Sequence, residues 1–127
     1  MENFDFEKLR AYQKALDFTD AVYKITLNFP SEERFGLADQ FRRAVVSIPL
    51  NIAEGSGGST AEFKQFIKIA RRSTRECVAI IEIAVRQKYF TTKEKEHLRT
   101  YCADLSRMLN GLLKSLSPNA ERKTPND

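Results

Sequence analysis

The chain has 127 residues, of which 42% are hydrophobic and 30% are charged, with only five glycines and four prolines. This length and composition fit one folded domain with a single core and exclude a disordered or collagen-like chain. The 21 lysines and arginines exceed the 17 acidic residues, so the net charge is +4 and acidic partners are favoured.

The sequence shows no sign of a membrane segment. It contains no stretch of about 18 uncharged apolar residues, and its amino end is acidic where a signal peptide is cationic and then apolar. A basic amphipathic helix can also lie on an anionic membrane, but the apolar faces of the other segments are expected to cover that surface. The sequence therefore predicts a cytoplasmic protein that does not bind membranes.

The first helical segment is predicted over Phe6–Asn28, because its apolar residues recur at alternating spacings of three and four. Pro30 ends it, since a proline disfavours the helical conformation of the residue before it. We expect a short connection or a single turn over residues 29–36.

The second segment is predicted over Leu37–Glu54 and contains Pro49. A proline inside a helix removes the hydrogen bond to the carbonyl four residues back and clashes with that turn. We therefore expect a helix that is kinked at Pro49 and whose last turn begins near Asn51, with two shorter helices as the alternative. The glycine-rich stretch over residues 54–60 ends this segment.

Two capping boxes mark the starts of the third and fourth segments. In each, a serine or threonine is followed three residues later by a glutamate: Ser59 by Glu62, and Thr91 by Glu94. Each pair satisfies backbone N–H groups that the first helical turn leaves without a partner. The third helix is expected to continue to about Lys88.

Four amphipathic segments joined by short connections, without any strand pattern, predict an all-α protein. Their simplest packing is an antiparallel four-helix bundle over residues 1–117. Residues 118–127 include two prolines and few apolar side chains, so they are predicted to form a disordered tail.

The third segment has two distinct faces. The face with alternating spacings of four and three is predicted to be buried, and it comprises Phe63, Ile67, Ala70, Thr74, Cys77, Ile81 and Ala84. At about 100° per residue, another side of the helix carries Lys64, Lys68, Arg71, Arg72 and Arg75, with Arg86 further on. Residues 60–88 contain seven Lys and Arg and three Glu, so this segment has the net charge of the whole chain.

The apolar arc of the third segment is wider than the core of one bundle requires. Four further apolar residues lie beside the buried face: Phe66, Ile69, Ile80 and Ile83. We predict that they form an interface with other copies of the chain, which makes the protein a homo-oligomer. Burial in a broader bundle core is the alternative.

The five cations Lys64, Lys68, Arg71, Arg72 and Arg75 are predicted to bind the backbone of RNA or DNA, because lysine and arginine displace the counterions condensed on phosphates. No aromatic platform accompanies them, so binding is expected to be independent of sequence. Two alternatives remain open. One is a solvated helix face, and the other is an adaptor protein whose cations meet an acidic protein partner such as a polymerase.

Arg42 and Arg43 of the second segment are weaker candidates for the same nucleic-acid-binding role. Adjacent residues point about 100° apart on a helix, so at most one of them can face the bundle. A guanidinium there needs a carboxylate, and the candidates are Glu54, Glu76 and Glu82. We predict a structural ion pair for one of the two arginines.

The sequence offers no catalytic residue, metal site or cofactor site. Cys77 and Cys102 lack C-x-x-C spacing and are interpreted as small buried hydrophobic residues. Ser47 has no identifiable activating base, because His97 is the only histidine. Glu94 and His97 form a single Glu-x-x-His pair, whereas a bundle metal site requires a second copy. We therefore do not expect an enzyme.

The run from Phe35 to Gly55, FGLADQFRRAVVSIPLNIAEG, resembles the hallmark of the four-helix-bundle proteins encoded within intervening sequences of bacterial large-subunit ribosomal RNA genes. Further matching positions are Phe29-Pro30 with Glu33, Glu62-Phe63 and Phe66, the stretch from Ala70 to Glu76, and the stretch from Met108 to Leu112. The resemblance covers nearly the whole chain and independently implies the bundle.

The resemblance also implies a small basic homo-oligomer, a pentameric ring in the known members, without enzymatic activity. Relatives act as accessory proteins to the reverse transcriptases of diversity-generating retroelements. This chain departs from the family pattern at Gly58, where relatives often carry a basic residue, and at Arg72, where they usually carry glycine. Cations have thus moved from the loop to the helix, so a binding surface cannot be transferred by position.

Overall fold

The computed structural model describes residues 4–117, and these residues form helices without any strand. The four α-helices are α1 (Arg10–Thr26), α2 (Leu37–Ser56), α3 (Thr60–Arg86) and α4 (Thr92–Ser115). Two short 3-10 helices precede α1 and α2: η1 (Asp5–Lys8) and η2 (Ser31–Glu33). The predicted all-α bundle is confirmed, and the predicted disordered tail lies outside the described residues.

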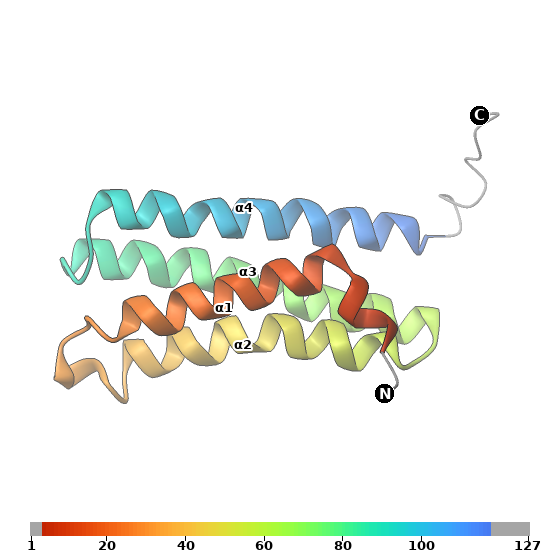
Figure 1. Cartoon of the computed structure of the whole chain (residues 1–127), viewed down its shortest axis with the longest axis horizontal. Helices are drawn as coiled ribbons and strands as arrows, with labels where there is room; N and C mark the ends of the chain where they lie inside the picture. The colour runs from red at the N-terminus through yellow and green to blue at the C-terminus, as the bar shows by residue number, and fades with distance from the viewer. Residues whose placement is uncertain (1–3, 118–127) are drawn as a thin grey trace.

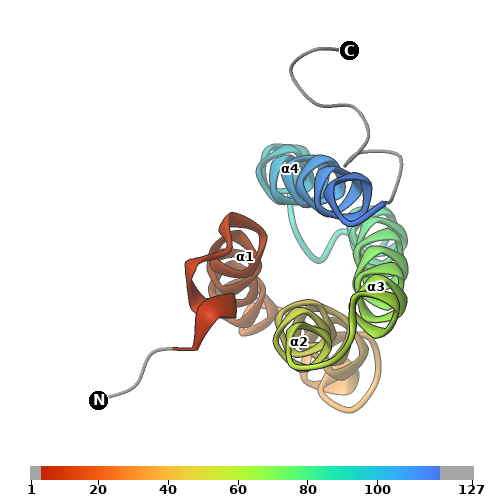
Figure 2. The same ribbon diagram turned by 90° about the vertical axis from the view of Figure 1, so that its right-hand side faces the viewer.

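The four helices lie side by side along one long axis (Figure 1), and their ends occupy the corners of a square when the bundle is viewed along that axis (Figure 2). Helices α1 and α3 each contact both α2 and α4. The connections lie at alternating ends of the bundle. The core between the helices contains large, fully buried side chains from all four: Phe18, Phe41, Ile48, Ile52, Ile67, Ile81, Leu98, Leu105 and Leu109.

The first segment differs from the prediction at its start. Instead of one helix from Phe6, a 3-10 turn is followed by Leu9 in an extended conformation, with φ −70° and ψ 130°, and only then by α1. The Phe6 ring packs edge-on against the Tyr12 ring, with their centroids 4.9 Å apart. This aromatic contact holds the turn against α1, which periodicity alone does not predict.

Helix α2 is continuous from Leu37 to Ser56 with Pro49 buried inside it, so the alternative of two shorter helices was wrong. The kink at Pro49 stays a prediction. Two residues before it, the Ser47 hydroxyl accepts hydrogen bonds from Asn51 and from Ser73 of α3, both at 2.9 Å. Ser47 therefore joins α2 to α3 in a polar cluster.

Both predicted capping boxes are confirmed. The Glu62 N–H donates to Ser59 Oγ at 3.2 Å while Glu62 Oε1 accepts from the Ser59 N–H at 2.8 Å. At the start of α4, the Glu94 N–H donates to Thr91 Oγ1 at 3.1 Å and Glu94 Oε1 accepts from the Thr91 N–H at 2.7 Å. These local bonds set where both helices begin.

Glu33 joins the two connections at one end of the bundle. Its Oε1 accepts a hydrogen bond from the Leu37 N–H at 3.0 Å, at the start of α2, and its Oε2 accepts one from the Tyr89 hydroxyl at 2.8 Å. The Tyr89 ring also packs against Phe29, with their centroids 5.2 Å apart. Both hydrogen bonds stabilise the carboxylate and lower the pKa of Glu33, and the bond from the Leu37 N–H has the larger effect.

Helices α2 and α3 approach closely at Gly55. A Cβ atom added to Gly55 would lie 2.5 Å from Phe66 Cβ and 3.1 Å from Phe63 Cδ1. The first distance is too short for two carbon atoms, and the Phe66 Cβ is attached directly to the α3 backbone. The absence of a side chain at Gly55 therefore allows the two helices to pack at this distance.

Replacing Gly55 with alanine is expected to destabilise the fold by about 1–3 kcal/mol, because overpacking outweighs the gain in helix propensity. Gly111 of α4 is the matched control, since a Cβ there meets nothing within 4 Å. Gly111→Ala should stabilise the protein by up to about 1 kcal/mol. Urea unfolding measures both variants, and equal stabilisation by both would contradict the close approach at Gly55.

The Glu33 bonds predict a pH-dependent stability. The folded-state pKa of Glu33 is lowered, so the ionised carboxylate stabilises the fold at pH values above the ordinary glutamate pKa of about 4.3. This stabilisation is lost as the pH falls through the folded-state pKa. Glu33→Gln should therefore be less stable than the unsubstituted protein at pH 7, and the gap should close in acid. Thermal unfolding from pH 7 to pH 3, with Glu32→Gln as control, tests this; a gap that persists at pH 3 would refute it.

Candidate nucleic-acid interface

The five predicted cations of α3 lie between residues 64 and 75, nearer its start than its end. We call Lys64, Lys68, Arg71, Arg72 and Arg75 the cationic face. At 1.5 Å per residue they span about 16 Å along the helix. Arg72 and Arg75 are exposed, while the other three are partly buried along their length. The charged ends of long cationic side chains reach water even where their stems pack on the protein.

The cationic face has no acidic partner within residues 4–117. None of its five side chains has a carboxylate oxygen within 4.0 Å in that part of the chain. Arg71 donates a hydrogen bond to the uncharged side-chain oxygen of Asn110 in α4, at 3.1 Å. Glu82 of α3 instead pairs with Lys95 at 3.1 Å, which lowers the pKa of Glu82. The charge of this face is therefore available to an external anion.

A groove of about 420 Å³ runs between α3 and α4 beside the cationic face. Its lining residues are Arg71, Thr74, Arg75, Val78, Ala79, Arg99, Cys102, Ala103 and Ser106. We call this the α3–α4 groove. Arginines from both helices line it, and no carboxylate is among the lining residues. The arrangement can hold an anion between two helices.

Sequence reasoning missed Arg99. It lies on α4, one residue after the fully buried Leu98, and the nearest cations before it, Lys93 and Lys95, alternate with glutamates. Its proximity to Arg71 and Arg75 results from the packing of α4 against α3. The available signal was the helical periodicity of α4, which places Arg99 beside the buried face.

Arg42 does not join the cationic face. Its Nε donates to the Thr26 hydroxyl at 3.0 Å, and its guanidinium lies 5.8 Å from the centre of the Tyr23 ring. Both partners belong to α1, so the side chain joins α1 to α2. This role is structural, and it uses a hydroxyl and an aromatic ring in place of the expected carboxylate.

Arg43 forms an ion pair, but on the surface of α2 and not inside the bundle, where the predicted pair was placed. Its Nε lies 3.0 Å from Asp39 Oδ2, one helical turn earlier on the surface of α2. The three candidate partners were wrong, because an i,i+4 carboxylate on the same helix is closer than any of Glu54, Glu76 and Glu82. The structure therefore brings neither Arg42 nor Arg43 to the five cations of α3.

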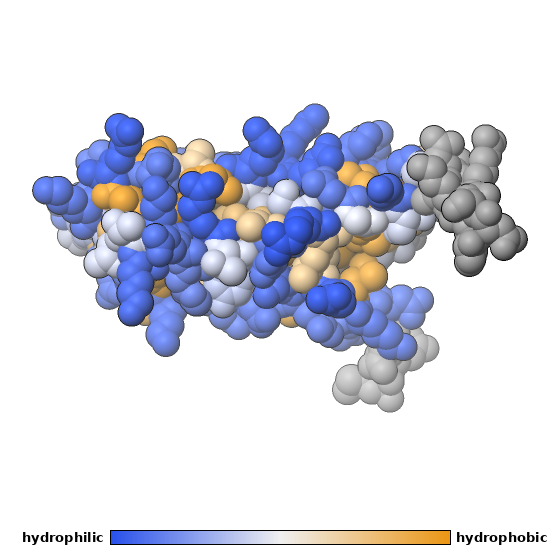
Figure 3. All heavy atoms as spheres, turned by 90° about the horizontal axis from the view of Figure 1, so that it is seen from above, coloured by the Kyte–Doolittle hydropathy of each residue, from blue (hydrophilic) through white to orange (hydrophobic). Residues whose placement is uncertain are grey.

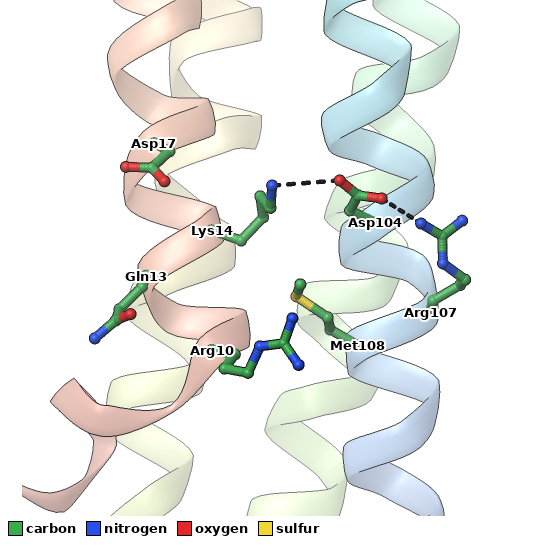
Figure 4. A pocket seen from close by; sticks show the side chains of 7 residues that line it. All are labelled: Arg10, Gln13, Lys14, Asp17, Asp104, Arg107 and Met108. Atoms are coloured by element: carbon green, nitrogen blue, oxygen red, sulfur yellow. Dashed lines mark hydrogen bonds and ion pairs between the residues drawn. The ribbon is translucent and has the colours of Figure 1, made fainter.

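A second cavity, of about 520 Å³, lies between α1 and α4 (Figure 4). Asp104 of α4 pairs there with Lys14 of α1 at 3.3 Å and also with Arg107 of its own helix. Lys14 additionally lies 5.6 Å from the centre of the Tyr101 ring. Cations and a carboxylate are thus paired in this cavity, and the Lys14–Asp104 ion pair joins α1 to α4.

The four residues predicted to contact other copies are not equally accessible. Ile80 is only 2% exposed, so it belongs to the core of the single chain and is corrected from interface to core. Phe66 is partly buried against Gly55. Ile69 and Ile83 are 41% and 47% exposed. A broader core thus accounts for part of the wide apolar arc.

The two cysteines are buried, as predicted. Burial raises the pKa of Cys102 to about 12 and raises the pKa of Cys77 as well, so both thiols are protonated at neutral pH. Glu94 serves the capping box, and the His97 ring packs edge-on against Tyr101 with centroids 5.4 Å apart. Residues 4–117 contain no group of three His, Cys, Asp or Glu side chains arranged to hold a metal ion.

Figure 3 looks onto the α4 side of the bundle and shows hydrophilic side chains over most of it, with smaller apolar patches between them. Within the described part of the chain, every helix is too short or too polar to cross a membrane. The fold and surface define a small all-α bundle protein with a basic helix face.

The chain belongs to the family of 23S rRNA-intervening sequence proteins, whose family model matches residues 7–111. The fold is also similar to a crystal structure of a protein of unknown function from the S23 ribosomal protein family of Bacteroides thetaiotaomicron VPI-5482. That match has a TM-score of 0.76 and 24% sequence identity, and it covers 82% of this chain and 95% of the other. A search of curated proteins gave no match.

Proposed function

We propose that this protein is a non-enzymatic, oligomeric protein that binds the backbone of RNA or DNA through the cationic face of α3. One observation supports this proposal above the others: five lysines and arginines occupy about three turns of one helix without a carboxylate partner in residues 4–117. Membership of a family named for ribosomal RNA intervening sequences agrees with a nucleic-acid partner.

The mechanism is electrostatic docking. Each phosphate that a lysine or arginine neutralises releases condensed counterions, and the resulting gain in entropy drives association. Exposed aromatic side chains lie elsewhere, at Phe4, Tyr23 and Phe35, so the cationic face offers no ring on which bases can stack. Binding is therefore independent of sequence and strongly dependent on salt.

Reversing three charges together, by Lys68→Glu, Arg71→Glu and Arg75→Glu, should abolish binding to structured RNA and duplex DNA. Fluorescence anisotropy over a salt series measures the effect. For the unsubstituted protein, log affinity should fall linearly with log salt, with a slope of about 0.9 per phosphate contact on duplex DNA. Circular dichroism should show the same helical signal in the triple variant.

The matched control reverses three exposed charges outside the cationic face, Lys8, Lys24 and Lys93, to glutamate. It has the same net charge as the triple variant but should retain most of the affinity. Equal losses in both variants would show that only net charge matters and would overturn the assignment to α3. Absence of binding by the unsubstituted protein at low salt would refute nucleic-acid binding and leave an acidic protein partner or a solvated helix face as the explanation for the cations.

We infer further that copies of the chain associate through Ile69 and Ile83. The two side chains are about half exposed and lie on one side of α3, and Ile83 borders a cavity with the 85% exposed Phe35. At about 100° per residue this side is turned by about 120° or more from Arg71, so association leaves Arg71 accessible, whereas Arg72 lies on the same side as the two isoleucines. A pentamer is the subunit number that the family resemblance implies.

The double substitution Ile69→Glu and Ile83→Glu should dissociate the oligomer, because it places charges in an apolar interface. Light scattering coupled to size-exclusion chromatography measures the mass. Replacing Leu50, which is 60% exposed on α2, with glutamate is the control and should leave the mass unchanged. A monomeric unsubstituted protein, or an unchanged double variant, would contradict this interface.

A further inference from the structure

We propose that the α3–α4 groove is a phosphate-binding site, in which Arg71 and Arg75 of α3 and Arg99 of α4 hold one backbone phosphate between the two helices. This inference rests on the proposed function and names the point at which the strand is held most firmly. It adds Arg99, which lies on a different helix from the cationic face, to the binding residues.

The groove differs from the rest of the cationic face because its cations come from two sides. Lys64, Lys68 and Arg72 lie on α3 alone and contact a phosphate from one direction. In the groove, Arg71 and Arg75 line one wall and Arg99 lines the other. A guanidinium presents a rigid fork of N–H donors that matches two phosphate oxygens, so opposed arginines can contact a phosphate on different oxygens.

Within the described residues, none of the three groove arginines is paired with a carboxylate, and Arg71 is held by a neutral group. Asn110 Oδ1 accepts one hydrogen bond from Arg71, which leaves other N–H groups of that guanidinium available. Neither Arg75 nor Arg99 has a carboxylate oxygen within 4.0 Å in residues 4–117. The nearby Glu82 is paired with Lys95, and the charge of Arg99 adds a smaller contribution that also lowers the pKa of Glu82. A phosphate entering the groove therefore has no protein carboxylate to displace.

The other lining residues leave room for the ligand. Ala79 and Ala103 are small, and Ser106 adds a hydroxyl donor on the α4 wall. The volume of about 420 Å³ lies within the range of about 300–1,000 Å³ typical of small-molecule sites. It therefore admits a phosphate together with its sugar, which suits one nucleotide unit of a strand that continues along α3.

The test compares Arg99→Gln with Arg107→Gln. Both remove one arginine charge from α4, but Arg107 borders the α1–α4 cavity and pairs with Asp104. Anisotropy titration of a fluorescently labelled 12-nucleotide single-stranded RNA should show about tenfold weaker binding for Arg99→Gln and a salt slope smaller by about one contact. Arg107→Gln should bind within about twofold of the unsubstituted protein.

Arg99→Lys separates a specific contact from general attraction. Lysine keeps the charge but lacks the fork, so its affinity should fall severalfold while most of the salt slope remains. If Arg99→Gln binds like Arg107→Gln while the cationic-face triple variant loses binding, the groove assignment is wrong and the proposed function stands. Circular dichroism checks that each variant keeps its helices.

If the unsubstituted protein binds no nucleic acid, the proposed function fails, and the groove is tested alone with pyrophosphate by calorimetric titration. Binding that Arg99→Gln removes and Arg107→Gln retains would support a site for free phosphoryl compounds. Absence of pyrophosphate binding in that case would overturn the inference. When RNA does bind, competition by pyrophosphate that depends on Arg99 would support the same site.

Discussion

The packing of α3 between α2 and α4 is the constraint on which the rest of the structure depends. Ile67, Ala70, Cys77 and Ile81 are all fully buried on this helix, so its rotation about its own axis is set by the core. Once that rotation is set, its lysines and arginines between residues 64 and 75 lie on the outer side toward α4. The same burial that stabilises the bundle therefore determines where its charge is displayed.

Small residues allow this packing. Gly55 lets α2 approach the α3 backbone at Phe66, and Ser47 with Ser73 joins the same two helices by a hydrogen bond. On the other side of α3, Ala79 and Ala103 line the space shared with α4. Helix α3 therefore packs closely against α2 but leaves a groove against α4. The cations lie beside this groove.

Carboxylates pair with some of the cations of the protein. Outside the cationic face, four cations in the described part of the chain have such a partner: Arg43 has Asp39, Lys14 and Arg107 share Asp104, and Lys95 has Glu82. Such surface pairs contribute little to stability, but they reduce the local positive potential. The five cations of α3 have no comparable partner among residues 4–117. Their charges are therefore not offset by a carboxylate within 4.0 Å in that range.

The sequence by itself determined the class of fold, the capping residues Ser59 and Thr91 that precede α3 and α4, and the buried face of α3, because caps and helical periodicity are local properties. It did not predict the break at Leu9, the burial of Ile80, the Thr26 partner of Arg42, or the place of Arg99 in the groove. Each of these features depends on which side chains from other parts of the chain pack against the residue concerned. Only the tertiary structure decides that, because the packing of helices brings together residues that are far apart in the sequence.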